Sequence, residues 1–132
     1  MNKEELIELL KSLNFPKSEY YILSSGVLLF YGLREKAEDL DLCISEKLFN
    51  EVKNKYNLNN ENKNKYGFYK LLKNVEVVVD EPNIFKNKFD IKEGYQLQKL
   101  EDILEYKRKR NLDKDKKDVQ NITNYLKICN KN

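Results

Sequence analysis

Two aspartates spaced two residues apart are the residues of this chain best suited to chemistry. Asp39 and Asp41 alternate with Leu40 and Leu42. Because residues two apart on a β-strand point to the same face, a strand over 39–44 would project both carboxylates from one side and bury both leucines. Neighbouring carboxylates repel each other. A common reason to tolerate this repulsion is Mg²⁺, which usually takes one or two carboxylates together with substrate phosphates.

A corner of small residues lies upstream of the aspartates. Ser24, Ser25 and Gly26 follow an apolar strand expected over 20–23 and precede an apolar segment, 27–31, expected to be a short helix. Backbone N–H groups at such a strand-to-helix corner can hold an anion, and small residues let a phosphate approach closely. An ordinary tight turn is the alternative interpretation.

Together, the corner and the paired acids resemble the signature of the nucleotidyltransferase superfamily. This is the DNA polymerase β-like fold that includes aminoglycoside and lincosamide nucleotidyltransferases. Its pattern is a strand, Gly-Gly or Gly-Ser, a loop, and then hydrophobic-Asp-hydrophobic-Asp/Glu-hydrophobic. Twelve residues separate Gly26 from Asp39 here. The chain differs in having Ser-Ser-Gly at the corner and Glu38 before the first aspartate. The resemblance covers residues 18–126.

The resemblance also implies a third carboxylate on a neighbouring strand, which would deprotonate the acceptor hydroxyl and could touch the metal. A β-hairpin is expected over 66–72 and 75–80, with Glu76 and Asp80 on one face of its second strand. Glu76 matches the hydrophobic-acid-hydrophobic pattern of the family and is slightly favoured. Asp80 lies beside Pro82, as the acid does in several antibiotic-modifying members. A solvent-facing carboxylate is the alternative for either residue.

Arg34 is a candidate for a nucleotide phosphate contact from the loop before the acids. Arginine is scarce in this chain, and its planar fork suits phosphates. Small antibiotic-modifying and phage-defence nucleotidyltransferases often have Gly-Leu-Arg at this place. A surface salt bridge to Glu35 or Glu38 is the competing interpretation.

Lys107 is the corresponding candidate from the C-terminal part. It opens a charged segment that resembles the Lys…Arg-x-Lys-Asp-x-x-Asp tail of small nucleotidyltransferases, matched further on by Lys114, Asp115 and Asp118. In the family this tail packs beside the nucleotide site. A solvated corner between two helices explains the same charges by simple electrostatics.

The composition narrows the function classes. The chain of 132 residues has a net charge of +3 and no histidine, which excludes Ser-His-Asp and Cys-His catalysis within it. Two cysteines without histidine make a zinc site implausible, and Cys43 and Cys129 are expected to be reduced thiols of a cytoplasmic protein. No apolar run approaches the roughly 20 residues of a membrane span. Lysines interspersed with acids argue against a nucleic-acid partner.

We expect a single α/β (α+β) domain over 1–132: a small mixed sheet flanked by helices, with its core in 18–98 and a C-terminal helix pair in 99–129. Hydrophobic periodicity predicts the helices. They are expected over 3–13, 46–56 with Ser45 as N-cap, 99–109 and 114–129. Residues 81–98 read as a connector with strand-like pieces at 83–85 and 95–97, and Glu93-Gly94 marks a turn within it.

The activity implied by the resemblance is transfer of a nucleoside monophosphate from an NTP, such as ATP, to an acceptor hydroxyl. Asp39 and Asp41, with Glu76, would bind one or two Mg²⁺ ions. The nucleotide-binding candidates are Ser24, Ser25, Gly26, Arg34 and Lys107. The acceptor stays open, because acceptor pockets are built from loops that vary on one fold.

Two other classes of protein compete with the active enzyme. One is a degenerate member of the family that binds NTP without releasing pyrophosphate. The other is a phage-defence or toxin–antitoxin interaction protein, in which a homodimer mate or a partner protein completes the site. Metal-dependent NTP binding separates the active enzyme and the degenerate member from the interaction protein. Turnover then separates the active enzyme from the degenerate member.

Overall fold

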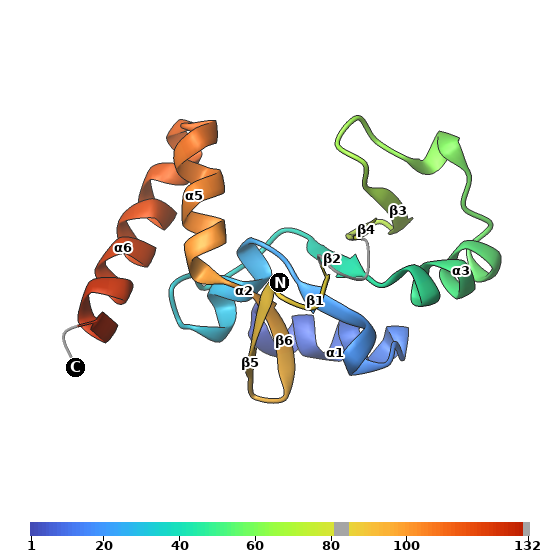
Figure 1. The fold of residues 1–132 in the computed structure, drawn as a ribbon, viewed down its shortest axis with the longest axis horizontal. Helices are drawn as coiled ribbons and strands as arrows, with labels where there is room; N and C mark the ends of the chain where they lie inside the picture. Colours follow the sequence, from blue (N-terminus) through green and yellow to red (C-terminus); the bar gives the residue numbers. More distant parts are fainter. Residues whose placement is uncertain (81–84, 131–132) are drawn as a thin grey trace.

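The computed structural model describes residues 1–80 and 85–130 and has a mixed α+β fold, which confirms the expected fold class (Figure 1). One six-stranded sheet has the order β3-β4-β2-β1-β6-β5. The strands are β1 Tyr20–Ile22, β2 Leu40–Ile44, β3 Tyr69–Leu72, β4 Val75–Val79, β5 Phe89–Lys92 and β6 Tyr95–Gln98. The helices are α1 Lys3–Leu13, α2 Ser25–Phe30, α3 Glu46–Lys55, α5 Leu100–Arg110 and α6 Lys116–Asn130.

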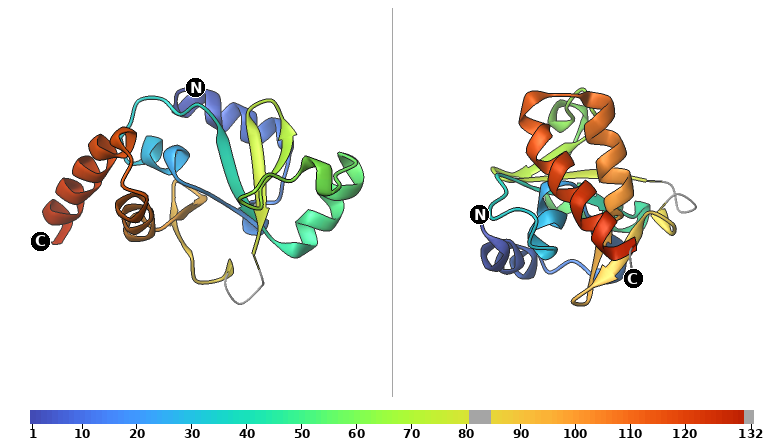
Figure 2. Two further views of the ribbon diagram at one scale, coloured as in Figure 1. Left: turned by 90° about the horizontal axis from the view of Figure 1, so that it is seen from above. Right: turned by 90° about the vertical axis from the view of Figure 1, so that its left-hand side faces the viewer.

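The centre of the sheet mixes parallel and antiparallel pairs. β2 runs parallel to β4 and antiparallel to β1, and β1 runs parallel to β6. The antiparallel partners β3 and β5 form the two edges. The helix pair α5–α6 lies at one end of the molecule, and α3 lies at the other (Figure 2).

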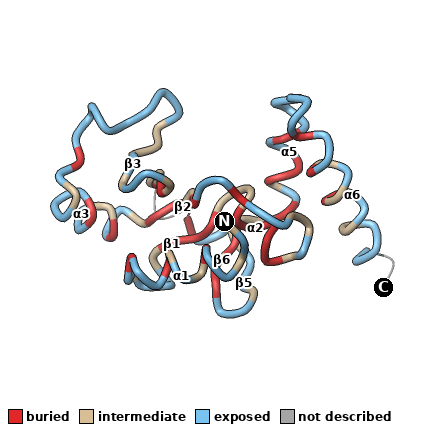
Figure 3. Tube along the Cα trace, turned by 180° about the vertical axis from the view of Figure 1, so that it is seen from behind, coloured by how far each residue is buried: buried red, intermediate tan, exposed pale blue. Residues whose placement is uncertain are grey.

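The hydrophobic core explains why the acids face away from it. Leu40, Leu42 and Ile44 of β2 are fully buried, as are Val75 and Val77 of β4. They join one core cluster with apolar side chains from all five of the helices described above. Buried positions concentrate in the central strands and the helices that cover them (Figure 3). Alternation then leaves the intervening residues of β2 and β4 on the other face.

Local signals place the helix ends close to where the sequence predicts them. Asn2 caps α1 by accepting from the Glu5 N–H, and Asn14 ends it in the left-handed conformation. Ser45 caps α3 as expected, with its Oγ accepting from the Leu48 N–H at 3.1 Å. These side chains satisfy backbone groups that a helix end leaves unpaired.

Two strand predictions need correction. The hairpin begins at Tyr69 rather than at 66, because the Asn64 side chain accepts from the backbone N–H groups of Tyr66 and Phe68 and holds 64–68 in a turn. The sequence-based prediction also missed β5, which pairs with β6 across the left-handed residues Glu93 and Gly94. Of the strand-like piece expected at 83–85, residues 83 and 84 lie outside the described residues.

None of the helices within 1–80 and 85–130 combines the length and the apolar character that crossing a membrane requires.

Gly26 is the glycine that packing requires most clearly. A Cβ atom there would lie 2.9 Å from Ile22 Cγ2 and 3.1 Å from Leu6 Cδ1, both fully buried. We expect Gly26→Ala to destabilise the protein by about 1–3 kcal/mol, because overpacking outweighs the better helix propensity of alanine. Urea unfolding followed by circular dichroism would measure this change. An alanine variant as stable as the native protein would contradict the close approach of α2 to β1 and α1.

Candidate functional site

The parallel pairing of β2 and β4 brings two carboxylates side by side. Asp41 of β2 is the direct register partner of Glu76 of β4. Both residues are half-buried and lie on the face opposite the core valines and leucines. The sequence predicted this face for both acids, and the register adds that they are immediate neighbours across the sheet.

Asp39 completes the group from the residue before β2. It is exposed, and its spacing from Asp41 places it on the same side of the strand. Burial raises the pKa of Asp41 from 3.8 to about 6, and the charges of Glu76 and then Asp39 add to this rise. The site therefore holds more negative charge than its surroundings neutralise.

Lys70 is a cationic residue on the strand next to Glu76. Lys70 of β3 is the register partner of Glu76, so Lys70, Glu76 and Asp41 form a row over three strands. Within the described residues, no lysine or arginine nitrogen lies within 4.0 Å of an oxygen of Asp39, Asp41 or Glu76. Sequence reasoning did not single out Lys70, because only the strand register brings it to the site.

A metal ion can be held wholly by protein side chains, or by a few side chains together with waters and substrate. Within 1–80 and 85–130, no group of three His, Cys, Asp or Glu side chains is arranged so that it could hold a metal ion. Magnesium usually needs only one or two carboxylates from the protein, because waters and substrate phosphates fill its other positions. Asp41 with Asp39 or Glu76 supplies that number of hard oxygen ligands.

The small-residue corner is directly connected to the acid strand. The Leu23 N–H donates to the Asp41 carbonyl oxygen at 2.9 Å, so the chain turns into α2 immediately beside Asp41. Ser24 adopts φ 55° and ψ −125°, a conformation that non-glycine residues rarely take. Its N–H donates to Gln98 Oε1 at 3.0 Å and is thereby occupied. Sequence reasoning missed Gln98, which reaches the corner from the end of β6.

Arg34 reaches the corner from the loop between α2 and β2. Its Nη1 donates to Ser25 Oγ at 3.2 Å and to Asp118 Oδ2 at 2.9 Å, while its Nε donates to the Lys36 carbonyl oxygen at 2.7 Å. The expected alternative, a salt bridge to Glu35 or Glu38, is not formed. The structure therefore brings together Ser25 and Arg34, two of the predicted nucleotide-binding residues.

Lys107 is placed differently from the prediction. Its side chain is 3% exposed, and its Nζ lies 3.3 Å from Asp115 Oδ1 and 3.2 Å from Asp118 Oδ2. A lysine buried between two carboxylates is not free to contact a phosphate, so we correct its expected role to a structural one. The sequence did not reveal this burial, because the two carboxylates come from the segment that follows the next turn.

Asp80 lies on the same face as Glu76 but has a partner of its own. It follows β4, and Tyr21 donates its hydroxyl to Asp80 Oδ2 at 2.9 Å. Tyr21 belongs to a small second cluster with Cys43 and Phe85, and burial raises the pKa of the Cys43 thiol to about 12. Of the two candidates for the third carboxylate, Glu76 is the one placed beside Asp41.

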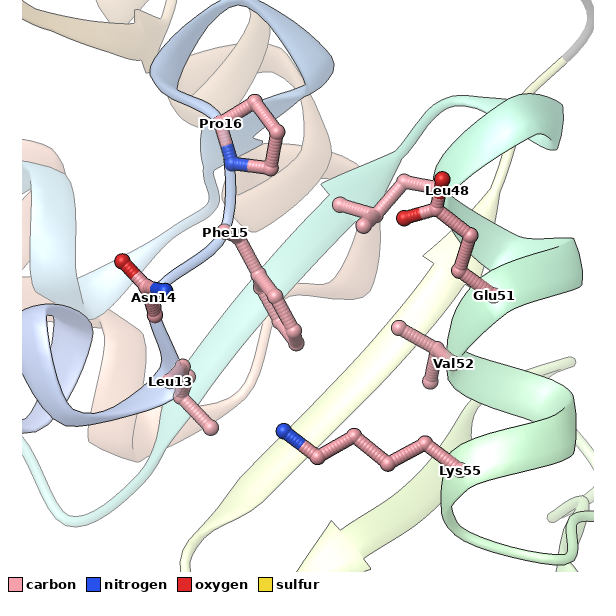
Figure 4. A pocket seen from close by; sticks show the side chains of 8 residues that line it. All are labelled: Leu13, Asn14, Phe15, Pro16, Leu48, Glu51, Val52 and Lys55. Carbon is pink, nitrogen blue, oxygen red and sulfur yellow. The ribbon is translucent and has the colours of Figure 1, made fainter.

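Two hollows on the surface of the described residues lie away from the acids. One of about 140 Å³ opens between the end of α1 and α3 (Figure 4). Its lining combines apolar side chains, among them Leu13, Phe15, Leu48 and Val52, with the polar Asn14, Glu51 and Lys55. Another, of about 220 Å³, lies at the corner between α5 and α6 and includes Lys107 and Asp115. Neither hollow contains Asp39, Asp41 or Glu76.

Comparison of the chain with protein-family models, curated proteins and solved structures found no match.

Proposed function

We propose that this protein is a Mg²⁺-dependent nucleotidyltransferase that moves a nucleoside monophosphate from an NTP to an acceptor hydroxyl. The observation that carries the proposal is the register of Asp41 opposite Glu76, with Asp39 two residues before Asp41 and on the same face. The raised pKa of Asp41 supports it, since the cause is burial beside unneutralised carboxylates. A bound cation would relieve that repulsion.

Magnesium fits the residues present, because Asp39, Asp41 and Glu76 offer hard oxygen ligands. We propose that Asp39 and Asp41 hold one or two ions and that Glu76 contributes to the same site. When bound, Mg²⁺ supplies Lewis-acid stabilisation of charge on the phosphates. Glu76 is the proposed general base that accepts the proton of the acceptor hydroxyl. The Tyr21 hydrogen bond makes Asp80 the weaker candidate for this role.

The phosphates of the NTP are assigned to the corner beside Asp41. Ser25 and Arg34 already contact each other there, and Arg34 provides the planar fork of donors that suits phosphate oxygens. The Leu23 N–H bond to the Asp41 carbonyl keeps this corner next to the acid strand. The acceptor hydroxyl, on an antibiotic, a protein side chain or a nucleic-acid end, is left open by this proposal.

One observation favours a second candidate, a nucleotide-binding module without turnover. The Ser24 N–H, which the corner would offer to a phosphate, is bonded to Gln98. The remaining donors of the corner could bind a nucleotide without aligning it for reaction. NTP binding without pyrophosphate release, in the presence of a broad set of acceptors, would select this candidate.

Calorimetric titration tests the proposal. ATP and the other NTPs, each with Mg²⁺, would be titrated into the native protein and into the Asp39→Asn/Asp41→Asn variant. We expect metal-dependent binding to the native protein and none to the variant. Absence of binding to a native protein with a folded circular dichroism spectrum would overturn the proposal for the isolated chain. A second copy or a partner protein that completes the site would then be sought.

A further inference from the structure

A cluster of buried charges joins the C-terminal helix pair to the corner beside Asp41. Lys107 of α5 lies between Asp115 and Asp118, and all three side chains are at most 8% exposed. Arg110 also donates to Asp115, through Nε at 2.8 Å. Asp115 therefore has two cationic partners within its own helix pair.

Asp118 connects this cluster to a distant part of the chain. The oxygen that faces Lys107 at 3.2 Å also accepts from Arg34 Nη1 at 2.9 Å. Arg34 lies 84 residues away in the sequence and contacts Ser25 with the same Nη1. A continuous set of contacts thus runs from Lys107 through Asp118 and Arg34 to Ser25.

We propose that Asp118 is a positioning residue that holds the Arg34 guanidinium at the corner where the nucleotide phosphates bind. This inference rests on the proposed function, since it concerns the same site. Lys107 in turn fixes Asp118, which gives the buried lysine a role one step removed from the nucleotide. Asp118 itself touches no phosphate in this proposal.

The geometry explains why a held arginine should bind better than a free one. A free arginine side chain must give up rotamer freedom when it binds a phosphate, and pre-organisation removes that loss. Charge-assisted hydrogen bonds are stronger and shorter than neutral ones. The Arg34 side chain remains 34% exposed, and within the described residues its Nη2 makes no hydrogen bond. This nitrogen is the donor left for a ligand oxygen.

The charge of the cluster also favours an anion. Arg34, Lys107 and Arg110 supply three positive charges, whereas Asp115 and Asp118 supply two negative ones. The cluster therefore carries one net positive charge. Asp115 faces Lys107 and Arg110, so Asp118 alone is shared between Lys107 and Arg34. The Arg34 end of the cluster is therefore incompletely neutralised and can accept phosphate charge.

The test measures MgATP affinity by calorimetry for the native protein, Asp118→Asn, Arg34→Gln and the double variant. We expect Asp118→Asn and Arg34→Gln each to weaken binding by about tenfold, and the double variant to be no weaker than Arg34→Gln, because both substitutions remove one effect. Asp118→Glu, which keeps the charge, should recover part of the affinity. With an acceptor in hand, the loss should appear in KM for ATP rather than in kcat.

Asp113→Asn is the matched control. Asp113 lies in the turn between α5 and α6, carries the same charge as Asp118 and is 95% exposed, and its ion-pair partner among the described residues is Lys116 at 3.0 Å. It should bind MgATP within about twofold of the native affinity. An equal loss in Asp113→Asn and Asp118→Asn would show that net charge alone sets the affinity and would overturn the proposal.

The outcomes separate this inference from the proposed function. If the native protein binds MgATP and Asp118→Asn binds it equally well, the positioning role is overturned and the proposed function stands. If the native protein does not bind MgATP, the proposed function falls and the inference falls with it. Should Asp118→Asn fail to fold, Arg34→Lys carries the test. It keeps the charge but not the fork, so native-like binding by this variant would overturn the proposal.

Discussion

Replacing Asp41 with asparagine is expected to make the metal-free protein more stable at pH 8, by about 1–2 kcal/mol. The pKa of this carboxyl is raised from 3.8 to about 6 by burial, Glu76 and Asp39. A rise of two pKa units corresponds to about 3 kcal/mol. Solvent around the half-buried group screens part of this, which gives the smaller figure. Asparagine removes the charge while keeping the shape of the side chain.

The sign of the effect fixes its pH dependence. Below the unfolded pKa of 3.8, Asp41 is protonated in both the folded and the unfolded chain, and its charge has no effect on stability. Above about pH 6 it is ionised in both, and the folded state carries the whole unfavourable interaction. The stability advantage of Asp41→Asn should therefore develop between these two values and stay constant at higher pH. Thermal unfolding of both proteins from pH 3.5 to 8 measures it.

The matched control is Asp90→Asn, the same substitution at an exposed position of β5. Its effect on stability should stay within about 0.5 kcal/mol. Mg²⁺ should raise the unfolding midpoint of the native protein but not that of Asp41→Asn, because a ligand that binds only the folded state stabilises it. A variant that is less stable than the native protein at pH 8 would contradict the unneutralised cluster of acids, and with it the argument for a cation.

Residue spacing was sufficient to predict which face of the sheet carries the acids. Alternation with buried leucines and valines determines the side on which Asp41 and Glu76 project, and this can be read from the sequence. Their position as register partners could not be read, because register depends on how β2 and β4 pair in the folded chain. The same limit explains why Lys70 was missed.

Long-range ion pairs account for the errors at the basic residues. The competing interpretation of Arg34 was a salt bridge to Glu35 or Glu38, but its carboxylate partner is Asp118, 84 residues further on. Lys107 was expected at a phosphate, but two carboxylates enclose it. A lysine in a charged segment normally lies in solvent, and only tertiary packing that supplies both partners can bury it. Charge patterns therefore identified the charged segments but not the ion-pair partners of Arg34 and Lys107.

The strand β5 was not predicted from the sequence for a different reason. Its four residues Phe89–Lys92 include two charged side chains, and Ile91 is 70% exposed. An edge strand with little buried surface leaves a weak apolar pattern in the sequence. The turn at Glu93 and Gly94, by contrast, was recognised, because the left-handed conformation it needs favours glycine. Turn chemistry thus located the turn, whereas the pairing of β5 with β6 could be seen only in the fold.

Replacing Asp115 with alanine is expected to lower the free energy of unfolding by about 3–5 kcal/mol, because it removes one anionic partner from a buried ion cluster. The Asp115 carboxylate is 3% exposed and accepts from both Lys107 and Arg110. Its removal leaves the buried Lys107 ammonium with Asp118 alone. Urea unfolding of the native protein, Asp115→Ala and the exposed control Asp113→Ala measures the difference, and the control should change by less than about 0.5 kcal/mol.

The ionised Asp115 carboxylate stabilises the folded protein, whereas the ionised Asp41 carboxylate destabilises it. Their contributions to stability therefore change with pH in opposite directions. The Arg110 hydrogen bond, followed by Lys107, lowers the pKa of Asp115 from 3.8 to about 2 against the effect of burial. The stabilisation is therefore complete above pH 3.8 and is lost as the pH falls through about 2. The difference between native and Asp115→Ala should be constant from pH 5 to 8 and shrink below pH 4. A difference that persists unchanged at pH 2 would mean that Asp115 contributes packing rather than charge, and the ion cluster would then not be what holds α5 and α6 together.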